Sequence, residues 1–242
     1  MRSQRLIALF LFIALAAVAR AENVTGTILI KRRLTKKSVT PAVSVYQRGA
    51  AVKLGQDTPQ DPIAYEQSRV VIYLEASKLE ASGLAGAGPT ADPQQASAPP
   101  QMAQLDRRFS PDLVVIPAGS TVLFPNMDPI FHNVFSLSKA KSFDLGSYDK
   151  GQTRRVMFPK PGIVDVYCHL HPNMAATVVV TPNRWYARPD SSGLYRIGDI
   201  PPGQYTVVAW HKSAGFFRKQ ITIAAGHDSV VDFFIPLEED AK

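Results

Sequence analysis

The chain has 242 residues, with 27 Lys and Arg against 20 Asp and Glu, and a formal net charge of +7. Arg2, Arg5 and Arg20 contribute three of these charges within a 21-residue N-terminal segment that has no acid, which leaves +4 for the remainder. This modest excess, without basic and aromatic residues interleaved on one element, argues against a nucleic-acid partner and favours an acidic protein partner only weakly.

The first 21 residues have the features of a secretory signal peptide. Two arginines precede an apolar run over residues 6–19, and the small residues Ala19 and Ala21 suit cleavage after Ala21. No later apolar run approaches the ~18 residues that cross a bilayer. We therefore expect an exported, periplasmic protein whose mature chain has no transmembrane segment.

Short segments rich in β-branched and aromatic residues dominate the rest of the chain and predict strands. Most are bounded by Gly, Pro, Asn or Asp, as at Pro117-Ala118-Gly119, and no segment shows a helical period. We therefore expect an all-β protein built from sandwiches. The expected strands cover residues 24–30, 43–46, 70–75, 112–116, 121–124, 154–158, 163–168, 176–181, 194–197, 205–211, 217–223 and 229–235.

Residues 81–100 differ in composition from the segments on either side. They are rich in Ala, Gly, Pro, Gln and Ser, and Leu84 is their only large apolar residue. This composition is typical of a flexible linker or a long loop. The 220 or so residues after the signal suffice for two small β-domains at about 100 residues each, and we place the start of one at residue 101.

The only cysteine, Cys168, lies three residues before His171 and six before Met174. A thiolate, an imidazole and a thioether on one short loop make a soft copper site. In an oxidising compartment a lone cysteine is a free thiol, an intermolecular disulfide or a metal ligand, and its neighbours favour the last. His132, between two apolar stretches that both indicate strands, offers a second imidazole. Two histidines, a cysteine and a weak axial methionine form the blue-copper ligand set.

The spacing Cys168-x-x-His171-x-x-Met174, followed by an apolar strand, resembles that of the plastocyanin-like cupredoxins, and with Pro172 it is most similar to amicyanin. Upstream, residues 124–126 and 132–134 follow the family's order of strand, loop and first histidine ligand. The resemblance covers residues 101–181 and implies a cupredoxin Greek-key β-sandwich with one type 1 copper ion. It implies the ligands His132, Cys168, His171 and Met174, and a role for Asn133 in tying the two ligand segments together.

Two alternatives apply to single residues of this motif. A lone buried cysteine or histidine is ordinarily structural, and only the joint order and spacing favour a metal site. His169 poses a separate question, because adjacent Cys and His also occur in copper nitrite reductases and multicopper oxidases, where the histidine binds a second copper. Side chains alternate along a strand, so we expect His169 to point away from Cys168. Only His211 and His227 remain for a second site, and we expect His169 either at the surface or next to the ligands without binding a metal itself.

The C-terminal segment resembles the transthyretin-like domain of the carboxypeptidase regulatory type. Residues 193–197 and 201–207 follow its "G-x-Y-x-I … P-P-G-x-Y-x-V" pattern, but the first strands of that family are missing just upstream. Approximate matches appear instead at residues 24–28 and 70–74. We infer a cupredoxin domain inserted in a transthyretin-like β-sandwich, with N-terminal strands in 22–80, a linker at 81–100, the copper domain at 101–181 and C-terminal strands in 182–242.

The predicted function is single-electron transfer by an exported, non-enzymatic copper protein. The family passes electrons through the exposed edge of its second histidine, here His171, within an apolar patch that residues 129–131 and Pro172 would supply. The partner would be a soluble or membrane-attached redox protein, and the basic run at residues 31–37 is either a solvated loop or a dock for an acidic one. The alternatives are a copper-binding or copper-delivery protein without a redox role, and an adhesion or carbohydrate module in the transthyretin-like part.

Overall fold

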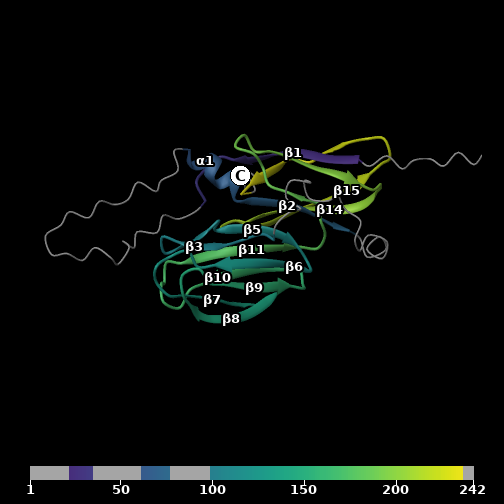
Figure 1. Cartoon of the computed structure of the whole chain (residues 1–242). Helices are drawn as coiled ribbons and strands as arrows, with labels where there is room; N and C mark the ends of the chain where they lie inside the picture. Colours follow the sequence, from purple (N-terminus) through teal and green to yellow (C-terminus); the bar gives the residue numbers. More distant parts are fainter. Residues whose placement is uncertain (1–21, 35–60, 77–98, 237–242) are drawn as a thin grey trace, which may run out of the picture.

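The computed structural model describes residues 22–34, 61–76 and 99–236, and nearly all regular structure in them is β-strand (Figure 1). The all-β prediction is therefore confirmed. Every expected strand within these ranges is present, although 229–235 is divided into β16 (Ser229–Val230) and β17 (Phe233–Ile235). The expected signal peptide, the strand at 43–46 and most of the expected linker lie outside the described residues.

One sandwich, which we call the terminal sandwich, combines strands from both ends of the described chain. Its first sheet has the order β13-β1-β16, with β17 also paired to β1, and its second has the order β12-β2-β14-β15. The pairings of β1 with β13 and of β2 with β14 are antiparallel. The strands not yet defined are β1 (Glu22–Ile30), β2 (Val70–Ala76), β12 (Tyr186–Ala187), β13 (Leu194–Ile200), β14 (Gly203–His211) and β15 (Gly215–Ile223).

The two sheets of the terminal sandwich enclose one apolar core. Alternate residues of each strand point into it, among them Ile28 of β1, Leu74 of β2 and Val207 of β14. The backbones approach each other closely at Gly26, because a Cβ there would lie 2.0 Å from the carbonyl oxygen of Val231. A side chain at this position would push β1 away from the segment that follows β16.

A short helix, α1 (Pro62–Ser68), precedes β2, and the expectation that no helix follows the signal was wrong. The carboxylate of Asp61 caps the helix by accepting the N–H groups of Ile63 at 2.8 Å and Ala64 at 3.1 Å. Pro62 occupies the first helical position, where it leaves no N–H unpaired. A helix of 7 residues is too short to display a period in the sequence.

The other sandwich, which we call the central sandwich, is formed by β3 to β11. Its larger sheet has the order β5-β11-β10-β7-β8, and two smaller sheets pair β6 with β9 and β3 with β4. The strand β8 was not expected, because its Ser, Asp and Gly residues conceal the alternation of Phe143 and Leu145. The strands are β3 (Ala103–Leu105), β4 (Arg108–Ser110), β5 (Leu113–Pro117), β6 (Ser120–Pro125), β7 (His132–Ser138), β8 (Lys141–Tyr148), β9 (Thr153–Phe158), β10 (Gly162–Tyr167) and β11 (Ala175–Thr181).

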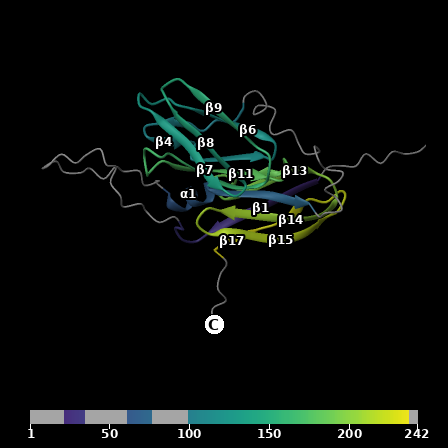
Figure 2. The ribbon, with the colours of Figure 1, turned by 90° about the horizontal axis from the view of Figure 1, so that it is seen from below.

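The two sandwiches pack against each other through β2 and β14 on one side and β5 and β11 on the other (Figure 1). Figure 2 shows β11 and β14 of the two sandwiches from below. The residues of β2 and β14 that alternate with the core residues form this contact. Val71, Tyr73, Val208 and Trp210 share one buried cluster with residues of β5 and β11 that include Val179. No helix in the described part of the chain is long and apolar enough to cross a membrane.

Candidate metal centre

Two segments of the central sandwich bring the candidate ligands together. His132 is the first residue of β7 and is fully buried. Cys168 and Met174 are the two ends of the loop that joins β10 to β11, and both are buried in the core of the central sandwich. The N–H of Met174 donates to the carbonyl of His171 at 3.0 Å, which closes a tight turn within that loop.

Three potential ligand atoms converge at this place. The Nδ1 atoms of His132 and His171 are 3.1 Å apart, and Sγ of Cys168 lies 3.9 Å and 3.7 Å from them, respectively. Metal ligands typically lie at about 2.0 Å for an imidazole nitrogen and about 2.3 Å for a thiolate sulfur. The three atoms are close enough to one another to share a single ion at such distances. Two imidazoles and one cysteine sulfur are the donor set of His₂Cys copper sites, so the residues fit copper.

Met174 is the fourth residue of the predicted ligand set. Its side chain is 1% exposed and belongs to the same buried cluster as Cys168. A thioether is a soft and weak donor, suited to copper and poorly suited to Mg²⁺ or Ca²⁺. The chemistry of the four side chains is therefore consistent with one copper ion.

Asp128 fixes the orientation of His132. One carboxylate oxygen lies 2.7 Å from Nε2 of His132, and the carboxylate also accepts the N–H groups of Asp106 and Arg107. Burial alone would raise the pKa of Asp128, but the hydrogen bonds from Arg107, His132 and Asp106 lower it below its ordinary value. The ionised carboxylate holds the proton of His132 on Nε2 and leaves the Nδ1 lone pair free to face Cys168.

Sequence reasoning did not identify Asp128. The available signal was an acidic residue four positions before the histidine, within Asn126-Met127-Asp128-Pro129. Asn126 builds the turn there, because its side-chain oxygen accepts the N–H of Asp128 and its amide donates to the carbonyls of Ile130 and Tyr148. This local geometry directs the carboxylate inward.

His171 is only partly buried, unlike His132. Burial lowers its pKa, and electrostatic repulsion by the neighbouring side chains of His132 and Arg107 lowers it further. The imidazole is therefore neutral at neutral pH, which is the form that binds a metal.

Asn133 links the two ligand segments. Its amide donates to Asp144 of β8 at 2.6 Å, and its oxygen lies 3.5 Å from the N–H of His169 in the loop after β10. A single side chain thus joins β7, β8 and the segment next to Cys168.

His169 points away from the three converging atoms. Its ring stacks on Phe135 at 3.7 Å between centroids, and its Nε2 lies 3.5 Å from a carboxylate oxygen of Asp144. His211 is buried against Glu66 in the terminal sandwich, and His227 contacts a backbone carbonyl. Among the described residues, the cluster of His132, Cys168 and His171 is therefore the group of His, Cys and acidic side chains placed to share an ion.

Exposed apolar residues directly precede three of the site residues in the sequence. Phe131 precedes His132 and is 57% exposed, and Leu170 precedes His171 and is 52% exposed. Met127 precedes Asp128 and is also exposed. Large apolar groups at the surface are characteristic of binding sites when they occur together.

No family model matches the chain, and no curated protein matches it significantly. Solved structures that resemble part of it include amicyanin from Paracoccus versutus, with 25% identity over 35% of this chain and 82% of that chain. A reduced mutant of amicyanin shows 23% identity over 35% of this chain and 84% of its own. The copper-containing nitrite reductase of Thermus scotoductus shows 26% identity over 34% of this chain and 22% of its own. The TM-score is 0.33 in each case.

Proposed function

We propose that the chain is an exported copper protein that carries single electrons on one type 1 copper ion, held by His132, Cys168, His171 and Met174. The observation that carries the proposal is the convergence of two imidazole nitrogens and one cysteine sulfur at a buried place. Copper would supply the one-electron chemistry, since it alternates between Cu(I) and Cu(II).

The surroundings of the ligands favour a redox role over simple storage. His132 is fully buried and its ring is fixed by Asp128, while Asn133 ties the second ligand segment to β7 and β8. Ligands held this firmly move little when the charge of an ion changes, and a small rearrangement makes electron transfer fast. A delivery protein needs the opposite, because it must release its metal.

The partly exposed His171 is the natural exit for the electron. Leu170 and Pro172, its exposed neighbours, and Phe131 near the other histidine offer an apolar surface on which a partner can exclude water. The partner would be a soluble or membrane-attached redox protein. His169 contacts Phe135 and Asp144 rather than another histidine, and we therefore propose a carrier rather than an enzyme with a second copper.

We also propose that residues 101–181 form a cupredoxin domain inserted in a transthyretin-like sandwich made from residues 22–80 and 182–242. The pairings of β1 with β13 and β2 with β14 support this division, because the C-terminal strands share both sheets with N-terminal ones. Export to the periplasm would accompany the proposed signal peptide at residues 1–21.

One titration tests the function. The purified chain with one equivalent of Cu(II) should develop an intense visible thiolate-to-copper band and undergo reversible one-electron reduction. The matched control is Cys168→Ser, which has nearly the same size and cannot supply the thiolate. A colourless site that readily gives its copper to a chelator would instead identify a copper-binding or delivery protein.

A further inference from the structure

A lysine of the terminal sandwich forms hydrogen bonds to both β10 and β11, the two strands of the central sandwich that the ligand loop connects. Lys212 follows β14, and its Nζ donates to Asp165 Oδ1 at 3.1 Å and to Thr177 Oγ1 at 2.8 Å. The hydroxyl of Thr177 in turn donates to the same oxygen of Asp165 at 2.9 Å. Asp165 and Thr177 face each other across the β10 and β11 pair, so the three side chains form a closed triangle over both strands.

This triangle lies at the base of the proposed copper loop. Asp165 precedes Cys168 by three residues, and Thr177 follows Met174 by three. At about 3.3 Å per residue along a strand, the triangle is roughly 10 Å from each end of the loop. Anything that separates β10 from β11 at this point therefore widens the loop that holds Cys168, His171 and Met174.

Lys212 extends from a turn that is itself held firmly. His211 is fully buried, with its Nε2 3.0 Å from Glu66 of α1, and its Nδ1 accepts the N–H of Ser213 at 3.2 Å. The carbonyl of His211 accepts the N–H of Ala214 at 3.1 Å. These three contacts fix the backbone of the turn between β14 and β15, from which the side chain of Lys212 extends.

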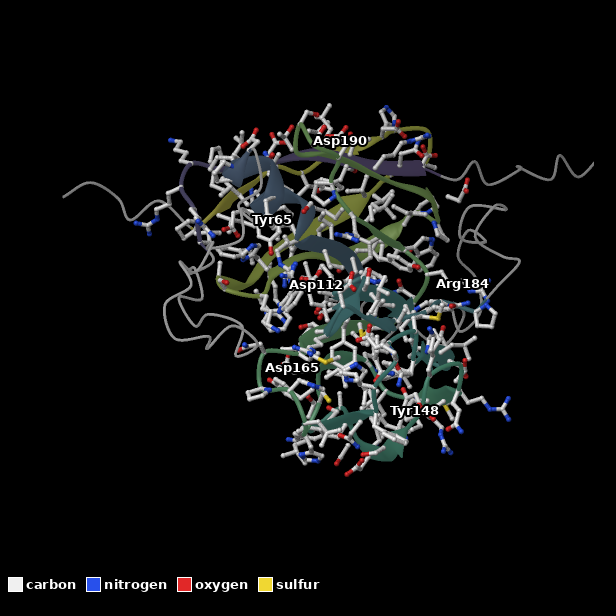
Figure 3. The ribbon with its side chains drawn as sticks, turned by 60° about the vertical axis from the view of Figure 1, so that its left-hand side comes forward. Tyr65, Asp112, Tyr148, Asp165, Arg184 and Asp190 are labelled. Atoms are coloured by element: carbon white, nitrogen blue, oxygen red, sulfur yellow. The ribbon has the colours of Figure 1, made fainter. Side chains whose placement is uncertain are left out.

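Apolar packing holds the same two strands beside the triangle. Trp210, two residues before Lys212, is buried in the cluster shared between the sandwiches, and Val179 of β11 belongs to that cluster. On the far side of β11, Arg69 forms an ion pair with Asp112 at 2.7 Å. Figure 3 labels Asp112 and Asp165, which mark the boundary between the two sandwiches.

We propose that Lys212 is a positioning residue for the copper site, through which the terminal sandwich sets the geometry of the loop from Cys168 to Met174. The inference rests on the proposed copper function. It assigns the terminal sandwich a role in that function, which is to hold the ligand loop of the central sandwich in place. The side chains of Lys212 and Asp165 are 39% and 37% exposed, and such an ion pair contributes little to overall stability. Its effect is local, because it joins two strands next to the loop.

The test compares three variants of the full chain. Lys212→Met keeps the length of the side chain and removes its charge and hydrogen bonds, and Lys212→Arg restores both. Lys160→Met makes the same chemical change at an exposed lysine in the turn between β9 and β10. The first measurement is amide hydrogen exchange of residues 168–174 in the metal-free protein, and the second is the rate at which a chelator removes Cu(II).

We expect Lys212→Met to speed both processes roughly five-fold, the effect of losing one or two hydrogen bonds, with a changed hyperfine splitting in the Cu(II) electron spin resonance spectrum. Lys212→Arg should restore wild-type behaviour and Lys160→Met should not alter it. Equal values for Lys212→Met and wild type would overturn the inference, as would faster exchange throughout the protein. A wild-type protein without the thiolate band would refute the proposed function, while the exchange measurement would still decide whether Lys212 orders the loop.

Discussion

The carboxylate of Asp128 lies 2.7 Å from Nε2 of His132, and this contact determines which ring nitrogen faces Cys168. Without it, the imidazole could adopt either tautomer, and only one of them presents a lone pair at Nδ1. The charge of the carboxylate also makes Nδ1 a stronger donor to a metal.

Asp128→Asn should therefore weaken copper binding by about 10- to 100-fold, the usual cost of losing a partner that orients a ligand. The amide can still accept the Nε2 proton but carries no charge. Competition with a chelator of known affinity measures the effect, and Asp149→Asn, at an exposed position in the turn before β9, is the control. Unchanged affinity would show that the orientation of His132 does not depend on the charge of Asp128.

Cys168→Ser should abolish the visible band of the copper-loaded protein, because only a thiolate supplies the electron for that transition. The buried position, 4% exposed, accepts a hydroxyl of similar size, so the chain should still fold. Absorption and circular dichroism spectra of the same sample separate the two effects. A band that persisted in a folded variant would show that the sulfur of Cys168 is not a copper ligand.

Met174→Leu should retain the visible band and raise the reduction potential. Loss of the weak axial donor destabilises Cu(II) more than Cu(I), and leucine fills the buried space with a side chain of similar volume. Cyclic voltammetry of wild type and variant measures the shift. A lower potential would argue that Met174 does not act as the axial ligand.

Stability should fall as the pH is lowered through about 6.5, the ordinary pKa of histidine, partly because of His211. Burial lowers the pKa of His211, and the charge of Arg69 adds to this, although the carboxylate of Glu66 opposes it. Below pH 6.5, His211 becomes protonated in the unfolded chain but stays neutral in the folded chain. This difference persists until the pH reaches the lowered pKa that His211 has in the folded protein. The unfolded state is therefore favoured across that window.

Urea unfolding of the metal-free protein at pH 7.5 and 5.5 measures this dependence, with His211→Gln as the variant. Glutamine can still donate to Glu66 but cannot be protonated, so the loss of stability between the two pH values should be smaller. Part of the pH dependence of stability should remain in this variant, because the pKa of His171 is also lowered in the folded protein. An identical loss in both proteins would contradict the assignment to His211.

Residues 182–242 alone should not fold. Their strands β13 and β14 pair with β1 and β2, and without those partners they expose half of the core of the terminal sandwich. Denaturant unfolding followed by circular dichroism checks this. A cooperative transition in the isolated fragment would exclude the proposed insertion, whereas adding residues 22–80 in trans should restore structure if it is correct.

The sequence predicted most of the strands, because long apolar segments such as β11 and β14 are unambiguous locally. It missed α1, whose seven residues are defined by the cap of Asp61 rather than by a period, and β8, whose apolar residues are few. It also missed β3, β4 and β12, because strands of two or three residues are too short to show an alternating pattern. Cys168, His171 and Met174 could be found because their spacing along one loop is itself the signal. Asp128 had only a weak signal, its place four residues before His132, because its role depends on a turn that directs it inward. Lys212 had none, because its role depends on a contact between segments 47 residues apart.

The pairing of β1 with the end of the chain constrains the order in which this protein can fold. The first partner strand of β1 is β13 at Leu194–Ile200, and Asn23 bonds to Asp228 across 205 residues of sequence, so β1 must remain unpaired until the chain has reached at least β13. Closing so long a loop is entropically costly unless intervening segments have already become compact. All strands of the central sandwich lie within residues 103–181 and pair with one another. This sandwich can therefore form before β1 has found its partners. We therefore expect the central sandwich to form first and to act as the nucleus that brings the two ends together.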